Sequence, residues 1–144
     1  MTKTVDNTVA DRFFIKTRSV AKMSTFHRYP IGCVAVYKGN IIATGYNKEK
    51  THPMQAYYNR YRNFNKPNDG TLLPKVHAEI DCLTELKKMD INFSKVKLFI
   101  YRTKISKDYG LARPCPACME AIKNLGIKDI YYTTEYGYAH ERIL

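Results

Sequence analysis

Short runs of apolar and β-branched residues, separated by turn residues, indicate that strands and helices alternate along this chain. Runs typical of strands cover residues 31–37, 41–47, 96–101 and 129–134. Apolar positions with helical spacing cover residues 9–23, 77–89 and 115–125. Gly39 lies between the first two strand runs and predicts a hairpin turn, and Gly126 is suited to ending the last helix.

The order of these elements predicts an α/β fold. Helix, hairpin, helix, strand, helix and strand follow one another, and strands that alternate with helices imply crossover connections over a sheet. We expect an α/β/α sandwich with a mixed sheet of at least four strands. Residues 138–144 would add a fifth strand or form a terminal helix. The chain has 144 residues with no internal repeat or linker, so we expect a single domain over residues 1–144.

Composition favours a globular protein in a reducing compartment. Hydrophobic residues make up 44% of the chain and charged residues 26%, as in ordinary globular domains. No apolar run approaches the ~20 residues of a membrane span, and the polar start, residues 1–12, resembles no secretory signal. We therefore expect a cytoplasmic location without a membrane partner. There the four cysteines would be metal ligands or core residues rather than disulfides.

The net charge is high and positive. Lys and Arg number 24 against 13 Asp and Glu, which gives +11 and a pI near 9.5. A field of this sign favours anionic partners, either phosphorylated small molecules or nucleic acid. A basic surface that only aids solubility is the simpler interpretation, and charge alone does not separate the two.

Two short segments carry residues with the chemistry of a metal site. His77-Ala78-Glu79 offers an imidazole and a carboxyl group, and Pro114-Cys115-Pro116-Ala117-Cys118 offers two thiols. Two cysteines and one histidine form an accepted ligand set for a catalytic zinc, which keeps its fourth position open. Cys115 and Cys118 would share one helix face near its N-terminus, where the helix dipole favours thiolate. Residues 77 and 79 reach one cavity only if His77 lies at or before the first turn of its helix.

A closed structural zinc site is the alternative, and it would need a fourth ligand. The remaining candidates are Cys33, Cys82, His27, His52 and His140. None of them forms a second C-x-x-C or H-x₃-H pair. Cys33 lies in an apolar strand and Cys82 in an apolar helix, so both are interpreted as core residues.

The H-x-E…P-C-x-x-C spacing resembles the signature of zinc-dependent nucleobase deaminases. From about Val9 to Thr134 the chain is similar to the cytidine deaminase-like superfamily, in the branch that uses one histidine and two cysteines. The segment Ser24–Cys33 resembles the one before the first strand in the deoxycytidylate deaminase-like group. The resemblance implies a Zn²⁺ cofactor held by His77, Cys115 and Cys118. It also implies a homo-oligomer and a nucleotide substrate.

Further residue roles follow from the same resemblance. Glu79 would move protons during catalysis. The substrate would be contacted by the side chain of Asn47, the backbone amide of Ala78 and the carbonyl of Pro114. The chain departs from the family pattern after Asn47, where Lys48 replaces a usual glycine. It also lacks the Glu-Pro-Cys of typical transfer-RNA adenosine deaminases, which favours cytosine as the base.

An insertion at about residues 52–76 mixes aromatic and cationic side chains. Its residues Met54, Tyr57, Tyr58, Tyr61 and Phe64 follow helical spacing, and Arg60, Arg62 and Lys66 are interleaved with them. Such a mixture can stack bases and neutralise phosphates, or it can form an amphipathic helix whose tyrosines pack. The candidates for binding a phosphate or nucleic acid are Arg28, His52, Arg60, Arg102 and Arg113.

These observations leave three functional hypotheses. The first is a deaminase of a cytosine nucleotide, with dCMP as the favoured substrate. The second is a deaminase of cytosine or adenine in single-stranded DNA, RNA or transfer RNA. The third is a zinc-stabilised module that binds nucleic acid without turnover.

Overall fold

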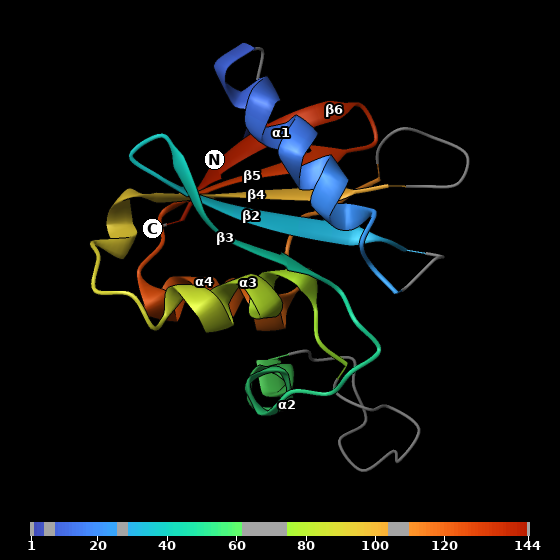
Figure 1. Cartoon of the computed structure of the whole chain (residues 1–144), viewed down its shortest axis with the longest axis vertical. Coiled ribbons are helices and arrows are strands. Elements are labelled where there is room, and N and C mark those ends of the chain that lie inside the picture. The colour runs from blue at the N-terminus through green and yellow to red at the C-terminus, as the bar shows by residue number, and fades with distance from the viewer. Residues whose placement is uncertain (1, 5–7, 26–28, 62–74, 104–109, 144) are drawn as a thin grey trace.

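The computed structural model describes residues 2–4, 8–25, 29–61, 75–103 and 110–143. Its centre is a six-stranded sheet with the strand order β1-β6-β5-β4-β2-β3 (Figure 1). The strands are β1 (Thr2–Thr4), β2 (Ile31–Tyr37), β3 (Asn40–Tyr46), β4 (Val96–Arg102), β5 (Asp129–Thr134) and β6 (Gly137–Arg142). The β4–β5 pair is parallel and the other pairs are antiparallel, so the predicted mixed sheet is confirmed.

The strands near the two ends of the chain, β1 and β6, go beyond what the sequence predicted. The C-terminal residues form the strand β6 and not a helix, which decides the alternative left open by the sequence. The short strand β1 was not predicted, and it pairs with β6 from Thr2 opposite Glu141 to Thr4 opposite Ala139. A strand of three residues has no alternation long enough to be recognised in a sequence.

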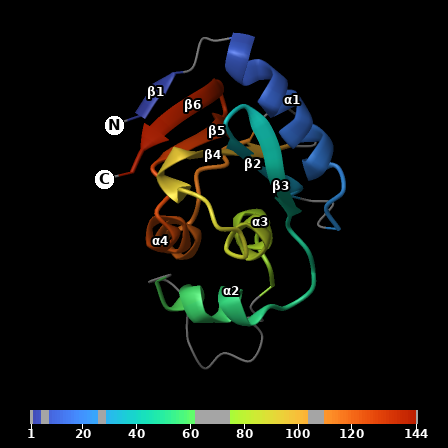
Figure 2. The same ribbon diagram turned by 60° about the vertical axis from the view of Figure 1, so that its left-hand side comes forward.

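Helices cover both faces of the sheet, as predicted for an α/β/α sandwich (Figure 2). Helix α1 (Thr8–Ala21) lies on one face, and α3 (Ala78–Leu86) and α4 (Pro116–Leu125) lie on the other. Helix α2 (Pro53–Tyr58) lies outside α3 and α4, followed by the 3₁₀ turn η1 (Asn59–Tyr61). A second 3₁₀ turn, η2 (Phe93–Lys95), precedes β4. None of the described helices is long and apolar enough to span a membrane.

Two glycines let the helices approach the sheet closely. A Cβ atom at Gly45 would lie 2.5 Å from the carbonyl oxygen of Ala78 and against the backbone nitrogen of Cys82. A Cβ at Gly32 would lie 2.5 Å from the backbone nitrogen of Ala21. Side chains larger than hydrogen would therefore push α3 off β3 and α1 off β2.

The core lies on both sides of the sheet. Between the sheet and the pair α3 and α4, the fully buried residues include Leu98, Ile100, Ile80, Leu83, Leu86, Ile122 and Ile130. Phe14, Val34 and Phe99 are buried on the α1 side. Cys33 and Cys82 are fully buried in the first of these clusters, which confirms that they are core residues.

The ends of the insertion are held together by backbone hydrogen bonds. The backbone nitrogen of Lys48 donates to the carbonyl of Val76 at 3.1 Å, and that of Val76 donates to Lys50 at 2.9 Å. Thr51 and Lys75 form an isolated antiparallel bridge. Met54, Tyr57, Tyr58 and Tyr61 belong to α2 and η1, whereas Arg62, Phe64 and Lys66 lie outside the described residues.

Candidate active site

The three predicted metal ligands lie together. Their donor atoms, one from each of His77, Cys115 and Cys118, are all within 4.8 Å of one another. The Nδ1 atom of His77 is 3.5 Å from the Sγ of Cys115 and 3.3 Å from the Sγ of Cys118. These residues are the only such group of His, Cys, Asp and Glu among the described residues. Two sulfurs and one imidazole nitrogen at this spacing fit a small, borderline-soft dication such as Zn²⁺, with room for a fourth ligand.

Both metal-bearing segments are helix starts, as the sequence predicts. His77 is the N-cap of α3 with an extended backbone, φ −82° and ψ 158°, and Cys115 is the N-cap of α4. Neither cap makes a side-chain hydrogen bond to its own helix, so the imidazole and the thiol stay directed toward the site. Pro116 in the first turn of α4 is tolerated because the backbone nitrogens there have no intrahelical acceptor.

Glu79 lies in the first turn of α3 and is 5% exposed. Burial raises the pKa of its carboxyl to about 7, although the nearby His77 acts in the opposite direction. His77 precedes the first turn and Glu79 lies within it, which resolves the geometric problem of two residues spaced two apart. Glu79 and the ligand residues His77 and Cys115 line the same cavity.

The two cysteine thiols have opposite pKa shifts. A hydrogen bond from Cys118 and the adjacent His77 lower the pKa of Cys115 to about 4, against the effect of burial. Burial raises the pKa of the Cys118 thiol well above its ordinary value. A bound dication would favour the thiolate form of both cysteines and release the proton of Cys118.

A cavity of about 380 Å³ opens beside these groups. His77, Glu79 and Cys115 contribute to its wall, and the other described residues that line it are Tyr29, Ile31, Asn47, Lys75, Val76, Arg102, Leu111, Ala112 and Arg113. The volume is in the range of sites for small molecules. The wall combines two of the three ligand residues, a buried acid and cations, so it can hold a polar anionic molecule next to the metal site.

Asn47 follows β3 and lines this cavity. Its side-chain Nδ2 donates to the carbonyl of Tyr29 at 2.7 Å, and its Oδ1 accepts from the backbone nitrogen of Ile31 at 3.0 Å and from the Ser24 hydroxyl. Asn47 thus fixes the segment that carries Tyr29. Its predicted contact with a substrate, like those of Ala78 and Pro114, stays a prediction. Ala78 and Pro114 are both buried beside the ligands.

Two of the five candidate phosphate-binding residues line the cavity. Arg102, at the end of β4, has its guanidinium carbon 4.8 Å from the centroid of the Tyr29 ring. Its Nη1 donates to the carbonyl of Leu111 at 3.4 Å, and its Nε is buried with no hydrogen-bond partner among the described residues. A buried donor of this kind needs an acceptor. Arg102 therefore offers the cavity a buried N–H donor that can bind an anion.

The guanidinium of Arg113 is already paired with Glu141. Its Nε and Nη2 each donate to a carboxylate oxygen of Glu141 at 2.9 Å, and Tyr132 donates to the same carboxylate at 3.0 Å. The bidentate hydrogen bonds from Arg113 lower the pKa of Glu141. Arg113 thus ties the segment before Cys115 to β6.

His52 and Arg60 lie on α2 and η1, away from the described wall of this cavity. His52 caps α2 by accepting a hydrogen bond from the backbone nitrogen of Met54 at 3.0 Å. Arg60 covers the Tyr57 ring with its guanidinium carbon at 4.1 Å from the centroid. Arg28 lies outside the described residues.

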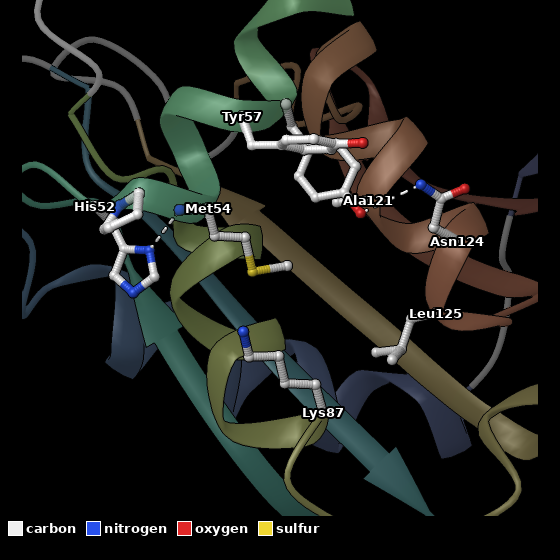
Figure 3. Close-up of a pocket in the computed structure, with 9 residues that line it drawn as sticks. His52, Met54, Tyr57, Lys87, Ala121, Asn124 and Leu125 are labelled. Atoms are coloured by element: carbon white, nitrogen blue, oxygen red, sulfur yellow. Dashed lines mark hydrogen bonds between the residues drawn. The ribbon is translucent and has the colours of Figure 1, made fainter.

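A second cavity, of about 610 Å³, lies between α2 and α4 (Figure 3). Met54 and Tyr57 of α2 point toward it, with Lys87 and Leu125 on the opposite wall. The Asn124 side chain donates to the Tyr58 hydroxyl at 3.2 Å and so connects the two helices. This cavity holds none of the metal ligands.

Sequence reasoning assigned no role to Tyr29, Lys75 and Gln55. Tyr29 and Lys75 line the active-site cavity but lie outside the H-x-E and P-C-x-x-C motifs. Gln55 donates and accepts hydrogen bonds next to His77, although it is one polar residue in an ordinary helical pattern. Only the position of Lys75, two residues before His77, is a signal that the sequence offered.

Comparison with known proteins agrees with this geometry. The family model "Cytidine and deoxycytidylate deaminase zinc-binding region" matches residues 8–134. No curated protein sequence matches the chain significantly. The metal implied by the donor set and by this family model is zinc.

Solved structures share the fold. The dCMP deaminase of cyanophage S-TIM5 in complex with dCMP and dUMP is 23% identical, with a TM-score of 0.61 over 92% of this chain and 85% of that one. Its apo form gives the same TM-score at 22% identity, covering 90% and 86% of the two chains. Cytidine deaminase from Mycobacterium tuberculosis is 14% identical, with a TM-score of 0.54 over 96% of this chain and 90% of that one. The predicted cytidine deaminase-like fold is confirmed.

Proposed function

The chain belongs to the cytidine and deoxycytidylate deaminase zinc-binding family, and on that premise we propose that it deaminates a cytosine nucleotide, with dCMP as the first candidate. The observation that carries the proposal is the burial of Glu79 in the same cavity as the ligand residues His77 and Cys115. The similar cyanophage enzyme, solved with dCMP and dUMP, supports a nucleotide of this class.

The reaction adds water across the C4 position of cytosine and expels ammonia. Zinc, when bound by His77, Cys115 and Cys118, supplies a Lewis acid that makes hydroxide available near neutral pH. Glu79 takes a proton from the attacking water and delivers it to ring nitrogen N3. The oxygen bonds to C4 as a hydroxyl group. Glu79 then takes the remaining proton of this hydroxyl and gives it to the amino group, so that the C4–N4 bond breaks, the C4 carbonyl forms and ammonia leaves. Uracil nucleotide and ammonia are the products.

Arg102 is the residue that we assign to the 5′-phosphate. It lines the cavity, its Nε has no described acceptor, and the ring of Tyr29 supports its guanidinium. Arg113 is less suited, since Glu141 already accepts from two of its nitrogens. A guanidinium that binds phosphate would select nucleotides over nucleosides.

A polynucleotide substrate is the second candidate. The net charge of +11 and the Arg60–Tyr57 pair, whose tyrosine is 47% exposed, favour it. Exposed aromatics next to cations can stack bases of a single strand. On this hypothesis, binding would weaken steeply with salt because counterions are released.

The test is ammonia release by zinc-loaded protein from dCMP, CMP, deoxycytidine, cytosine, single-stranded DNA and transfer RNA. We expect turnover of dCMP that Glu79→Ala abolishes. Glu85→Ala is the matched control, because Glu85 lies on the same helix with its side chain exposed. Turnover of single-stranded DNA or transfer RNA alone would favour the second candidate, a polynucleotide substrate, over a free nucleotide. Bound zinc without turnover of any compound would favour a binding module.

A further inference from the structure

Gln55 has a fully buried side chain that is hydrogen-bonded at both ends. Its Oε1 accepts from the backbone nitrogen of His77 at 3.0 Å, and its Nε2 donates to the Oδ1 of Asn59 at 2.8 Å. We propose that Gln55 is a positioning residue of the zinc centre. From its place in the insertion, Gln55 would hold the backbone of the metal ligand His77. The proposal rests on the zinc site of the proposed function but not on which compound is deaminated.

The need for such a residue follows from the start of α3. His77 is the N-cap, so its backbone N–H has no acceptor within the helix. In a capping box, the third residue of the helix would supply a carboxylate or amide acceptor to this N–H. That residue here is Ile80, which is apolar and buried. Gln55, 22 residues upstream, takes the place of the missing acceptor.

The imidazole of His77 makes no capping hydrogen bond to α3, in keeping with its place among the metal ligands. The position of the His77 backbone therefore sets where the ring can meet the sulfurs of Cys115 and Cys118. Of the two acidic residues in the first turn, Glu79 lines the cavity, and Asp81 accepts from the backbone nitrogen of Tyr46 at 3.1 Å and from the Lys48 side chain at 3.0 Å. Gln55 is thus the side chain that fixes the N–H of His77.

The amide of Gln55 has one defined orientation. Asn59 accepts from its Nε2, so the carbonyl oxygen faces His77. The backbone nitrogen of Asn59 in turn donates to the carbonyl of Gln55. This arrangement keeps the amide from rotating, because rotation would place two donors against each other.

Helix α2 is itself held on two sides. The pairing of residues 48–51 with 75–76 closes the insertion directly before His77. On the opposite face, Met54, Tyr57 and Tyr58 line the second cavity against α4 (Figure 3). Tyr58 accepts from Asn124 of α4. One short helix therefore contacts both α4, which carries Cys118, and the backbone of His77.

The experiment measures zinc affinity by competition with a chromophoric chelator, with no substrate present. For Gln55→Leu we expect a dissociation constant ~10- to 100-fold higher, the usual effect of losing a residue that orients a ligand. The visible spectrum of the Co²⁺-loaded variant should also change, since it reports the geometry of the thiolate and imidazole ligands. Ala56→Gln is the matched control, because Ala56 is the exposed neighbour on the same helix.

Gln55→Glu provides the rescue. A protonated carboxyl group has the shape and the hydrogen-bonding pattern of the amide, so we expect zinc affinity and the Co²⁺ spectrum close to those of the native chain. Native affinity and an unchanged spectrum in Gln55→Leu would overturn the proposal. If Gln55→Leu does not fold, Asn59→Ala tests the proposal instead, because it removes the acceptor that fixes the Gln55 amide. A native spectrum and affinity in Asn59→Ala would equally overturn it.

Since these measurements involve no turnover, they separate the two proposals. Weak zinc binding in Gln55→Leu supports the positioning role even if dCMP is not the substrate. Native zinc binding in this variant contradicts the role even if dCMP is turned over.

Discussion

The guanidinium of Arg102 lies 4.8 Å from the centre of the Tyr29 ring, and both residues line the cavity that holds Glu79. This relationship joins the end of β4 to the segment before β2. It places a cation in the same cavity as the buried carboxyl group of Glu79, without a carboxylate partner for that cation among the described contacts. On the proposed function, Arg102 would be the arginine that distinguishes a nucleotide from a nucleoside.

Replacement of Arg102 by Gln should lower kcat/KM for dCMP while leaving that for deoxycytidine nearly unchanged. A charge-assisted hydrogen bond contributes ~1.5–3 kcal/mol, so we expect a loss of roughly 10- to 150-fold. The measurement is ammonia release from the two compounds at several concentrations.

Arg60→Gln is the control for this change, since it removes the same charge outside the described cavity wall. An equal loss for dCMP in both variants would show that overall charge, and not Arg102, binds the phosphate.

Replacement of Cys115 by Ser should reduce bound zinc from one equivalent per chain to a small fraction. Cys115 and His77 are 38 residues apart, so the metal also links distant parts of the chain. We therefore expect a chelator to lower the melting temperature of the native protein. Elemental analysis and thermal unfolding measure the two effects.

The control for this prediction is Cys33→Ala, which removes a buried thiol from the core and not from the site. It should keep one zinc. Loss of zinc in Cys33→Ala alone would contradict the ligand set.

Replacement of Gly45 by Ala should destabilise the fold. The new methyl group would meet the carbonyl of Ala78 at 2.5 Å and the backbone of Cys82, so α3 must move. Overpacking of this kind costs about 1–3 kcal/mol or more. Urea denaturation gives the free energy of unfolding, and the zinc content shows whether α3 has moved with its ligand.

Gly39→Ala separates the steric effect from backbone strain. Gly39 has a φ of +80° but no atom within 4 Å of an added Cβ. It should cost only ~1–2 kcal/mol, from the left-handed backbone, and should leave zinc binding intact. A smaller loss for Gly45→Ala than for Gly39→Ala would disprove the close approach of α3 to β3.

The ion pair between Arg113 and Glu141 should give a pH-dependent contribution to stability. Hydrogen bonds from Arg113 lower the pKa of Glu141, so the folded state favours the carboxylate. This stabilisation is complete above the unfolded value of about 4.3 and is lost as pH falls through the folded pKa. Arg113→Gln should therefore reduce the free energy of unfolding at pH 7 by about 1 kcal/mol or less, as is typical of exposed pairs.

The difference between Arg113→Gln and the native chain should disappear in acid, below the folded pKa of Glu141. Urea denaturation from pH 3 to pH 7 measures this difference in the free energy of unfolding, with Arg60→Gln as the charge-matched control. A difference that stays constant across this range would exclude Glu141 as its source.

The sequence predicted the parts of the structure that follow from local patterns. His77, Cys115 and Cys118 could be assigned because a metal restricts both residue type and spacing. The position of His77 before the first turn of α3 followed from the need to share a cavity with Glu79. The predicted homo-oligomer stays a prediction, which light scattering can measure.

Other features depend on contacts between distant segments, which no local pattern contains. Arg102 and Arg113 looked equivalent, and only the fold places Glu141 beside one and Tyr29 beside the other. The role of Gln55 was hidden for the same reason, because a lone glutamine in a helix is ordinarily a solvated residue.

The pairing of β1 with β6 has a consequence for biosynthesis. Among the described strands, β1 pairs only with β6, Thr2 lying opposite Glu141. This edge of the sheet therefore cannot form until β6 has been synthesised. Meanwhile the ligands of the zinc site, which all precede residue 119, are already available. The metal centre can form on a nascent chain whose outermost strand is still unpaired.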